Sequence, residues 1–133
     1  MLPYVTRAEI VRWFETLQNC CRAVDYATAR GIFAEDVVAF GTRAEIVSGL
    51  DHLQANQWSG VWPKIRDFTF DLSQLRWGWS GDGGWGVATW TSTGFRPDGT
   101  PFHRPGRATV LFVRREGRLL AIHTHFSQTP VPA

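Results

Sequence analysis

The sequence of 133 residues lacks several features that mark membrane, secreted or nucleic-acid-binding proteins. No apolar run approaches about 18 residues, so we expect no membrane span. The first seven residues lack the basic-then-apolar order of a signal peptide, so we expect no secretory leader. The formal net charge is only +2 and, apart from Arg114-Arg115, the basic residues are scattered, so no nucleic-acid partner is expected.

Cysteine is scarce as well. The only two, Cys20 and Cys21, are adjacent in a predicted helix, where neighbouring side chains point about 100° apart and do not suit a disulfide. Two free thiols without a leader favour a reducing, cytoplasmic location. We interpret them as small buried hydrophobic residues, with a catalytic thiol as the alternative.

Tryptophan, by contrast, is abundant, with seven in the chain. An indole ring is large and amphipathic, and it is enriched where a pocket or an interface is lined. The composition is 44% hydrophobic and 20% charged, which suits a folded domain and leaves this excess of indole unexplained by a core alone. The sequence therefore predicts an aromatic pocket, an aromatic interface, or both.

The hydrophobic pattern of the first half is helical. Thr6 and Glu9 form a capping box that begins the first helix, and Ser48 and Asp51 form a second box that begins the last. Pro63 ends that last helix. We predict a first helix at residues 6–21, a second at 24–33, and a third that opens at the box of residues 48–51 and ends at Pro63. A short strand is predicted at residues 37–42.

Beyond Pro63 the pattern alternates with a period of two, which predicts antiparallel strands. The apolar parity changes between Leu72 and Leu75, which predicts a β-bulge there. Turns are expected at 80–84, 96–99 and 116–117, an irregular stretch up to 105, and strands at 85–95, 107–115 and 119–127.

The last strands carry apolar residues on both faces. Val110 and Phe112 point to one side, and Leu111 and Val113 point to the other. Three helices can cover one face of the sheet, so the other face needs a different cover. We expect a second copy of the chain there, giving a homodimer through the sheet.

Helices followed by a long antiparallel sheet resemble the nuclear-transport-factor-2-like (cystatin-like) α+β cone. Residues 114–127, which run from Arg-Arg-Glu-Gly to His-Thr-His-Phe-Ser, resemble the closing strands of SnoaL-like proteins and of the association domain of calcium/calmodulin-dependent kinase II. Residues 47–51 and 33–37 match two further motifs of that domain, Val-x-Gly-Leu-Asp and Phe-Ala-x-Asp-Val. The resemblance implies one SnoaL-like domain over residues 1–133, with three N-terminal helices packed on a strongly curved antiparallel sheet around a central pocket.

The resemblance does not imply one chemistry. Ketosteroid isomerases use a carboxylate base, a tyrosine and a protonated aspartate. Phe40 stands at the position of the base, Trp13 lies near that of the tyrosine, and Thr109 or Val110 stands at about that of the aspartate, so that chemistry is not expected. The arginines with which the kinase association domain binds small carboxylates are replaced as well, and Arg107 is the only substitute that we consider. The replacing residues are Trp90, Val110 and Phe126.

His123 and His125 form the clearest polar pair, about 6.5–7 Å apart on one face of a strand. A metal site needs a third ligand, and only His103 is near in sequence, so we expect no metal and no cofactor. Strand parity puts the two histidines opposite the pocket-facing Phe126, where they hydrogen-bond across the dimer interface. The alternative is that a bulge turns His125 into the pocket as a general base.

The sequence thus predicts a pocket for a hydrophobic or aromatic small molecule. As the alternative to simple binding we keep a cofactor-free isomerase, dehydratase or cyclase, in which His125, Asp25 or Tyr26 moves a proton and Arg107 steadies an oxyanion. Each of the last three has a structural alternative, as a helix-start carboxylate, a surface phenol and a rim arginine. An oligomerisation module is a further alternative. The expected ligand-binding residues are Trp13, Phe33, Phe40, Trp58, Trp62, Trp90, Arg107, Val110, Thr124 and Phe126; Trp77, Trp79 and Trp85 are assigned to the sheet end or the dimer contact.

Overall fold

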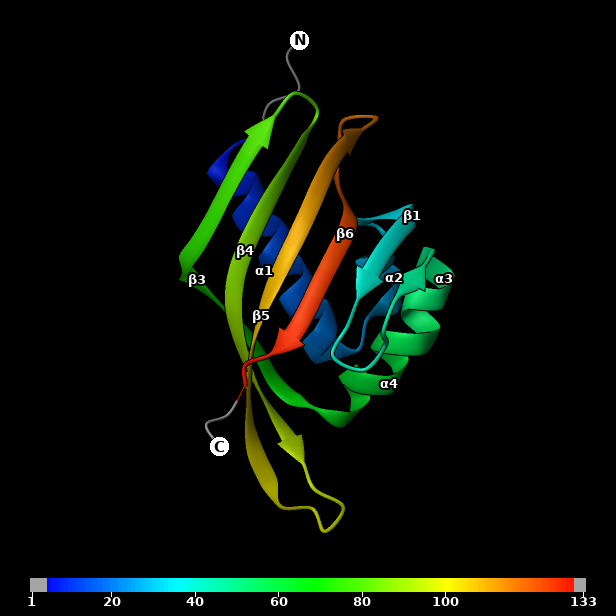
Figure 1. The fold of residues 1–133 in the computed structure, drawn as a ribbon, viewed down its shortest axis with the longest axis vertical. Coiled ribbons are helices and arrows are strands. Elements are labelled where there is room, and N and C mark those ends of the chain that lie inside the picture. Colours follow the sequence, from blue (N-terminus) through cyan, green and yellow to red (C-terminus); the bar gives the residue numbers. More distant parts are fainter. Residues whose placement is uncertain (1–4, 131–133) are drawn as a thin grey trace.

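A computed structural model of the protein describes residues 5–130 (Figure 1). The expectation that no signal peptide is present concerns residues that lie in part outside this range. Within it, six strands form one curved sheet in the order β2-β1-β6-β5-β4-β3. The strands are β1 (Phe33–Phe40), β2 (Val47–Ser48), β3 (Arg66–Ser80), β4 (Gly83–Phe95), β5 (Pro101–Arg115) and β6 (Arg118–Gln128).

Most of the sheet is antiparallel, as the alternating pattern predicts, but β1 pairs with β6 in parallel. This corrects the expectation of a purely antiparallel sheet. The two strands lie at opposite ends of the sequence, so no hairpin joins them, and local periodicity carries no information about their pairing.

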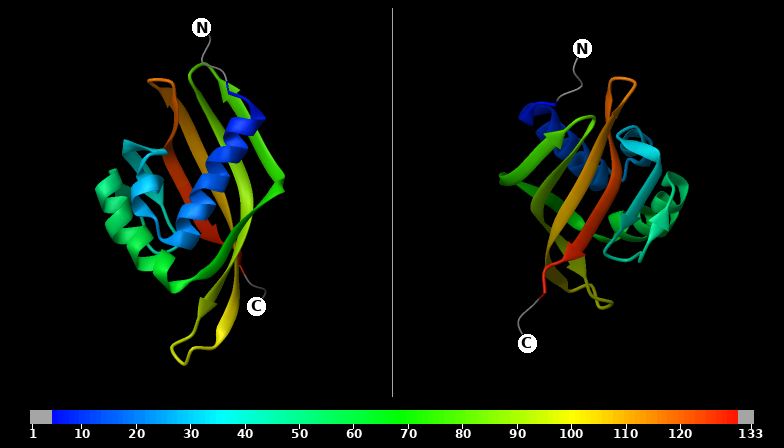
Figure 2. Two further views of the ribbon diagram at one scale, coloured as in Figure 1. Left: turned by 180° about the vertical axis from the view of Figure 1, so that it is seen from behind. Right: turned by 45° about the horizontal axis from the view of Figure 1, so that its top comes forward.

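The long helix α1 (Arg7–Ala23) crosses one face of the sheet. It lies behind the sheet in Figure 1 and in front of it in the left view of Figure 2. The predicted capping box of Thr6 and Glu9 is present, so the start of this helix is confirmed. Its apolar stripe enters the core, where Trp13 and Phe14 both contact the ring of Phe112.

The other helices differ from the prediction. The second, α2 (Tyr26–Arg30), is five residues long, because Val24 ends α1 in the left-handed conformation and Phe33 already belongs to β1. Asp25 caps α2 by accepting a hydrogen bond from the Thr28 amide.

The third helix is a helical segment of mixed type over residues 50–64. It comprises α3 (Leu50–Leu53), a π-helical turn (Gln54–Trp58), α4 (Ser59–Val61) and a 3₁₀ turn (Trp62–Lys64). The capping box predicted for its start is wrong, because Gly49 is the cap and Ser48 belongs to β2.

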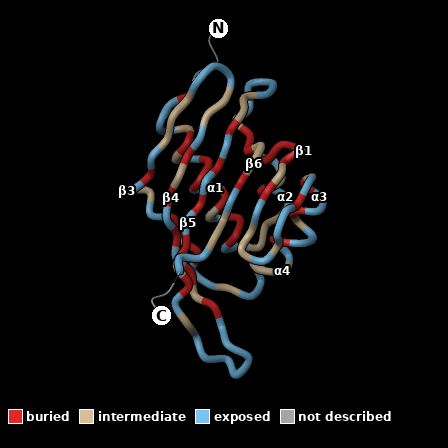
Figure 3. Tube along the Cα trace, viewed as in Figure 1, coloured by how far each residue is buried: buried red, intermediate tan, exposed pale blue. Residues whose placement is uncertain are grey.

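The irregular stretch predicted up to residue 105 is also wrong, because β5 begins at Pro101. Residues 101–105 pair with β4, whereas pairing with β6 begins at Gly106. Proline is tolerated at such a sheet edge, where a missing N–H removes no ladder bond. The β4–β5 hairpin consequently extends beyond the rest of the sheet, and Figure 3 shows its tip exposed.

The predicted change of parity in β3 is confirmed as a register shift against β4 between Asp71 and Arg76. The predicted turns are present after Ser80, after Phe95 and at Glu116-Gly117. Both residues of the last turn have positive φ, as a tight hairpin turn requires.

Strand parity separates the two faces of the sheet as expected. Val110 and Phe112 are fully buried on the helix side, whereas Leu111 is 40% exposed on the other side. None of the helices in residues 5–130 is long and apolar enough to cross a membrane.

Candidate functional site

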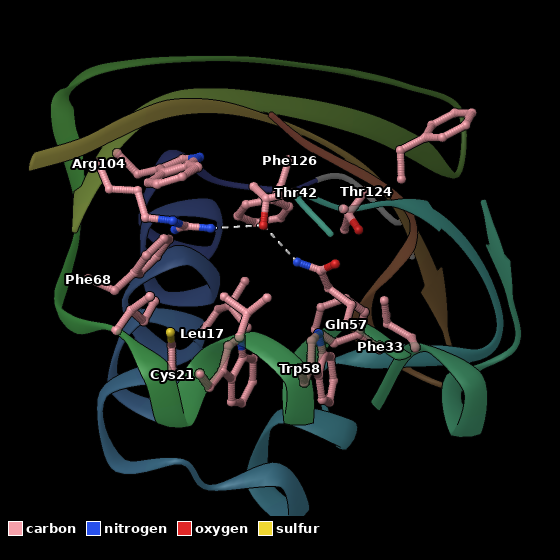
Figure 4. Close-up of a pocket in the computed structure, with 17 residues that line it drawn as sticks. Leu17, Cys21, Phe33, Thr42, Gln57, Trp58, Phe68, Arg104, Thr124 and Phe126 are labelled. Atoms are coloured by element: carbon pink, nitrogen blue, oxygen red, sulfur yellow. Dashed lines mark hydrogen bonds between the residues drawn. The ribbon is translucent and has the colours of Figure 1, made fainter. Parts of the chain in front are cut away.

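A cavity lies between α1, the helical segment 50–64 and the concave face of the sheet (Figure 4). The cavity has a volume of about 50 Å³, counted as the space that the centre of a water molecule can occupy. One water needs about 10–15 Å³ measured in this way, so the cavity has room for a few waters or one small ring. Seventeen residues line it: Leu17, Cys21, Phe33, Phe40, Gly41, Thr42, Leu53, Gln57, Trp58, Val61, Trp62, Ile65, Phe68, Trp90, Arg104, Thr124 and Phe126.

One wall of the cavity is a row of stacked aromatic rings. Trp58 and Trp62 are nearly parallel, with ring centroids 4.7 Å apart and an interplanar angle of 17°. Phe33 meets Trp58 edge-on at 5.0 Å, and Tyr26 stacks on the outer side of Trp62 at 5.6 Å. Such rings hold one another in place and present a rigid apolar surface to the cavity.

A small group of polar side chains also lines the cavity, next to the rings of Phe68 and Phe126. Nη2 of Arg104 donates to Oγ1 of Thr42 at 2.9 Å, and Nε2 of Gln57 donates to the same oxygen at 3.0 Å (Figure 4). Oε1 of Gln57 accepts from the amides of Arg43 and Ala44, which fixes the orientation of the Gln57 amide. The π-helical turn thus ties the loop after β1 to the cavity.

Arg104 is the most unusual of these polar groups, because it is only 8% exposed. Its Nη1 donates to Oγ of Ser92 at 3.2 Å, and its guanidinium lies 5.2 Å from the ring centroid of Trp90. The ion pairs formed within residues 5–130 involve Arg30, Arg114 and Arg115 and leave Arg104 without a carboxylate. Burial lowers the pKa of its guanidinium, yet arginine stays charged at neutral pH.

Cys21 lies on the α1 side of the cavity. Burial raises the pKa of its thiol to about 12. The thiolate is the reactive form of cysteine, so this thiol is inert near neutral pH. Its surroundings favour the interpretation of Cys21 as a small hydrophobic residue over that of a nucleophile.

The structure brings seven of the ten predicted ligand-binding residues to the cavity. Phe40 stands at its edge, 39% exposed and with its ring 5.1 Å from that of His125. The seven are Phe33, Phe40, Trp58, Trp62, Trp90, Thr124 and Phe126.

The other three predicted ligand-binding residues lie elsewhere. Trp13 is in the core, and its Nε1 donates to the carbonyl of Ile32 at 2.8 Å. Val110 is fully buried beneath α1 and does not reach the cavity. Arg107 is exposed and donates to Oγ of Ser127 at 3.0 Å.

The candidate proton-transfer residues also lie outside the cavity. His125 is exposed and pairs with Thr109, whose side of the sheet faces away from α1. Asp25 is the cap of α2, and hydrogen bonds from Thr28 lower its pKa. Tyr26 covers the outer side of Trp62. The register shift in β6 falls before His123, so it does not turn His125 inward.

Among residues 5–130, no three His, Cys, Asp or Glu side chains are grouped so that they could hold a metal ion. His103 lies in the extended hairpin opposite Thr93. Nδ1 of His123 lies 2.7 Å from the carbonyl oxygen of Val38 on the neighbouring strand.

Arg104, Thr42 and Gln57 were not predicted from the sequence. Arg104 had a usable signal, because it shares the parity of the inward-facing Ala108 and Val110 once β5 is extended backwards. The two prolines around it instead suggested irregular structure. Thr42 and Gln57 meet through a π-helical turn, for which the sequence shows no local signal.

A sheet wrapped around a covered apolar cavity, with one long helix across its concave face, defines the nuclear-transport-factor-2-like α+β cone. Residues 10–122 match the model of the SnoaL-like domain, and the chain belongs to this family. No curated protein matches the chain.

Solved structures share the fold over nearly the whole chain. An NTF2-like protein of unknown function from Pseudomonas putida is 26% identical, with a TM-score of 0.72 over 95% of this chain and 87% of that one. A ketosteroid isomerase-like protein from Erwinia carotovora atroseptica is 14% identical, with a TM-score of 0.78 over 93% and 96%. The association domain of CaMKII from C. elegans is 14% identical, with a TM-score of 0.71 over 92% and 94%.

Proposed function

We propose that this protein binds a hydrophobic or aromatic small molecule in the cavity between the helices and the sheet. The observation that supports it best is the stacked pair of Trp58 and Trp62 facing the cavity. Ligand sites are concave and mainly apolar, with a few converging polar groups. The cavity has this composition, since Arg104, Thr42 and Gln57 converge within a lining that is otherwise mainly aromatic and aliphatic.

Binding is testable with single-ring compounds, for which benzamide, benzoate and phenol serve as probes. We expect each bound probe to shift the indole N–H resonances of Trp58 and Trp62 in a two-dimensional NMR titration at millimolar concentrations. Trp58→Leu should abolish the response, and its thermal unfolding curve reports whether the variant is folded. A titration in which none of the three probes moves these resonances would refute the proposal.

A cofactor-free acid–base enzyme is the weaker candidate. The described residues that line the cavity include only two ionisable side chains, Cys21 and Arg104. With a pKa of about 12, the Cys21 thiol is a poor base at neutral pH, and arginine does not accept a proton there. A bound molecule would therefore meet a positive charge and hydroxyl groups, which suit recognition better than proton abstraction.

We further propose that two copies associate through the face of the sheet that the helices leave open. Two rows of paired residues support this. Val38, His123, Leu111 and Trp85 form one row, and Phe40, His125, Thr109 and Val87 form the next. Leu111, Trp85 and Phe40 are 39–42% exposed, which is costly for large apolar side chains.

The similarity to the association domain of CaMKII is in line with self-association. The buried free thiols of Cys20 and Cys21 favour a reducing, cytoplasmic environment.

A further inference from the structure

The polar end of the cavity carries a positive charge that no described carboxylate balances. Arg104 is only 8% exposed, and the ion pairs of residues 5–130 involve other arginines. Its described neighbours, which include the Cys21 thiol, the Trp90 ring and the hydroxyl groups of Ser92 and Thr42, carry no negative charge at neutral pH. A buried ion without a counter-ion is costly to the fold, so an arginine kept in this position calls for a partner of opposite charge.

The guanidinium also has unused donors. Hydroxyl oxygens of Ser92 and Thr42 accept from two of its five N–H groups. Neither acceptor is charged, and the Ser92 hydroxyl donates its own hydrogen bond to the backbone carbonyl of Arg104. Three N–H donors of the planar guanidinium therefore have no acceptor among these two hydroxyl groups and can bind a carboxylate.

Thr42 adds a second donor beside the guanidinium. Its Oγ1 accepts from both Arg104 and Gln57, so both lone pairs are used and the hydroxyl proton remains to be donated. Gln57 cannot reverse this arrangement, because its Oε1 already accepts two backbone amides. This end of the cavity thus offers donors and a positive charge, and the apolar rings of Trp58 and Phe33 line the same cavity.

We propose that the ligand is a small organic acid with a single-ring or similarly compact apolar body, whose carboxylate is bound by Arg104 and Thr42. This rests on the proposed binding function and names the chemical class of its ligand. The apolar body lies against the stacked rings of Trp58 and Trp62. The small free volume of about 50 Å³ favours one ring over a fused multi-ring skeleton.

The decisive comparison uses probes that differ only in charge. Benzoate and benzamide have nearly the same size and shape, as do phenylacetate and phenylacetamide. We expect the protein to bind each carboxylate at least tenfold more tightly than its amide at pH 7, as measured by isothermal titration calorimetry. The preference should disappear in Arg104→Met, while amide binding stays within about twofold.

Arg107→Met is the matched control, because Arg107 is an exposed arginine three residues further along β5, whose side chain donates to Ser127 outside the cavity. This variant should keep the full preference for carboxylates. Arg104→Lys keeps the charge without the planar fork and should retain part of it. Thermal unfolding of each variant shows whether it is folded.

The outcomes separate the two proposals. Amides that bind as well as carboxylates, or a preference that survives in Arg104→Met, would overturn the acid ligand and leave the binding function intact. If no member of either pair binds, both proposals fail. If Arg104→Met does not fold, two measurements still decide the question. They are the preference for acid over amide in the natural protein and the partial loss of that preference in Arg104→Lys.

Discussion

At the scale of single residues, burial decides what each polar group does. Cys21 has a thiol pKa of about 12, against an ordinary value of 9.0, because its surroundings desolvate the thiolate. The folded state therefore keeps this proton at pH values where the unfolded chain releases it. The contribution to stability is complete below about pH 9 and is lost as the pH rises from 9 towards 12.

We therefore expect the free energy of unfolding to fall more steeply above pH 9 in the natural protein than in Cys21→Ala. The difference in slope should approach about 1.4 kcal/mol per pH unit for one thiol. Urea unfolding at a series of pH values measures both slopes, and Cys20, whose pKa is raised too, is retained in both proteins. Parallel slopes would show that Cys21 ionises normally in the folded state.

The tryptophans divide by what their rings touch. Trp13 belongs to the core and donates its N–H to Ile32, whereas Trp58 faces the cavity. We expect Trp13→Phe to lower the free energy of unfolding by about 1–3 kcal/mol, because a buried carbonyl loses its donor and the ring becomes smaller. Benzoate binding, measured by calorimetry, should be unchanged. A loss of binding without a loss of stability would assign Trp13 to the site instead.

Arg104 shows how far sequence reasoning extends at this scale. The inward parity of β5 was evident from Val110 and Phe112, and the same alternation leads back to Arg104. Pro101 and Pro105 hid it, because proline is read as the end of a strand. The sheet tolerates them only because β6 does not reach that part of β5, which is a tertiary fact.

At the scale of elements, the π-helical turn and the loop after β1 position several residues of the cavity. The π-helical turn places Gln57 and Trp58 side by side on the cavity, and π-helical turns recur at functional sites. The Gln57 amide packs so closely on Gly41 that a Cβ there would lie 2.3 Å from Cδ of Gln57. Glycine at 41 therefore permits the contact between loop and helix.

We expect Gln57→Leu to lower the free energy of unfolding by about 1–3 kcal/mol, because the amides of Arg43 and Ala44 lose their acceptor. The preference for benzoate over benzamide should weaken as well, since Thr42 loses a partner that fixes its hydroxyl. Chemical unfolding and calorimetry measure the two effects. Gly41→Ala should have the same two effects, because its methyl group would push the Gln57 amide away from the loop. Unchanged stability and unchanged benzoate preference in both variants would contradict this account of the loop.

Features set by neighbouring residues were more predictable than features set by contacts between distant parts of the chain. The capping box of α1, the bulge in β3 and the tight turn at Glu116-Gly117 each follow from local chemistry, and each is present. The shortening of α2 and the parallel pairing of β1 with β6 follow from contacts between distant parts of the chain. No local pattern carries that information.

At the scale of the whole molecule, the sheet separates two functions. Its concave face, with α1 and the helical segment 50–64, encloses the cavity, and its open face presents Leu111 between Trp85 and His123. Adjacent residues of one strand thus serve opposite sides: Val110 and Phe112 pack under α1, and Leu111 faces outward. Changes at Leu111 or Thr109 on the open face should leave the cavity intact, because neither residue lines it.

We therefore expect the natural protein to sediment as a dimer at micromolar concentration and Leu111→Lys to sediment as a monomer. A lysine at the centre of the open face would place one charge from each copy in a desolvated contact, which opposes association.

Two further variants complete the test. Thr109→Lys, in the second row of the same face, tests whether the contact extends that far. Glu116→Lys, in the exposed β5–β6 turn, is the control for added charge alone. Benzoate binding should persist in all three variants, because none of these residues lines the cavity. A natural protein that sediments as a monomer would remove the proposed dimer, whereas a dimer unaffected by Leu111→Lys would move the contact to another surface.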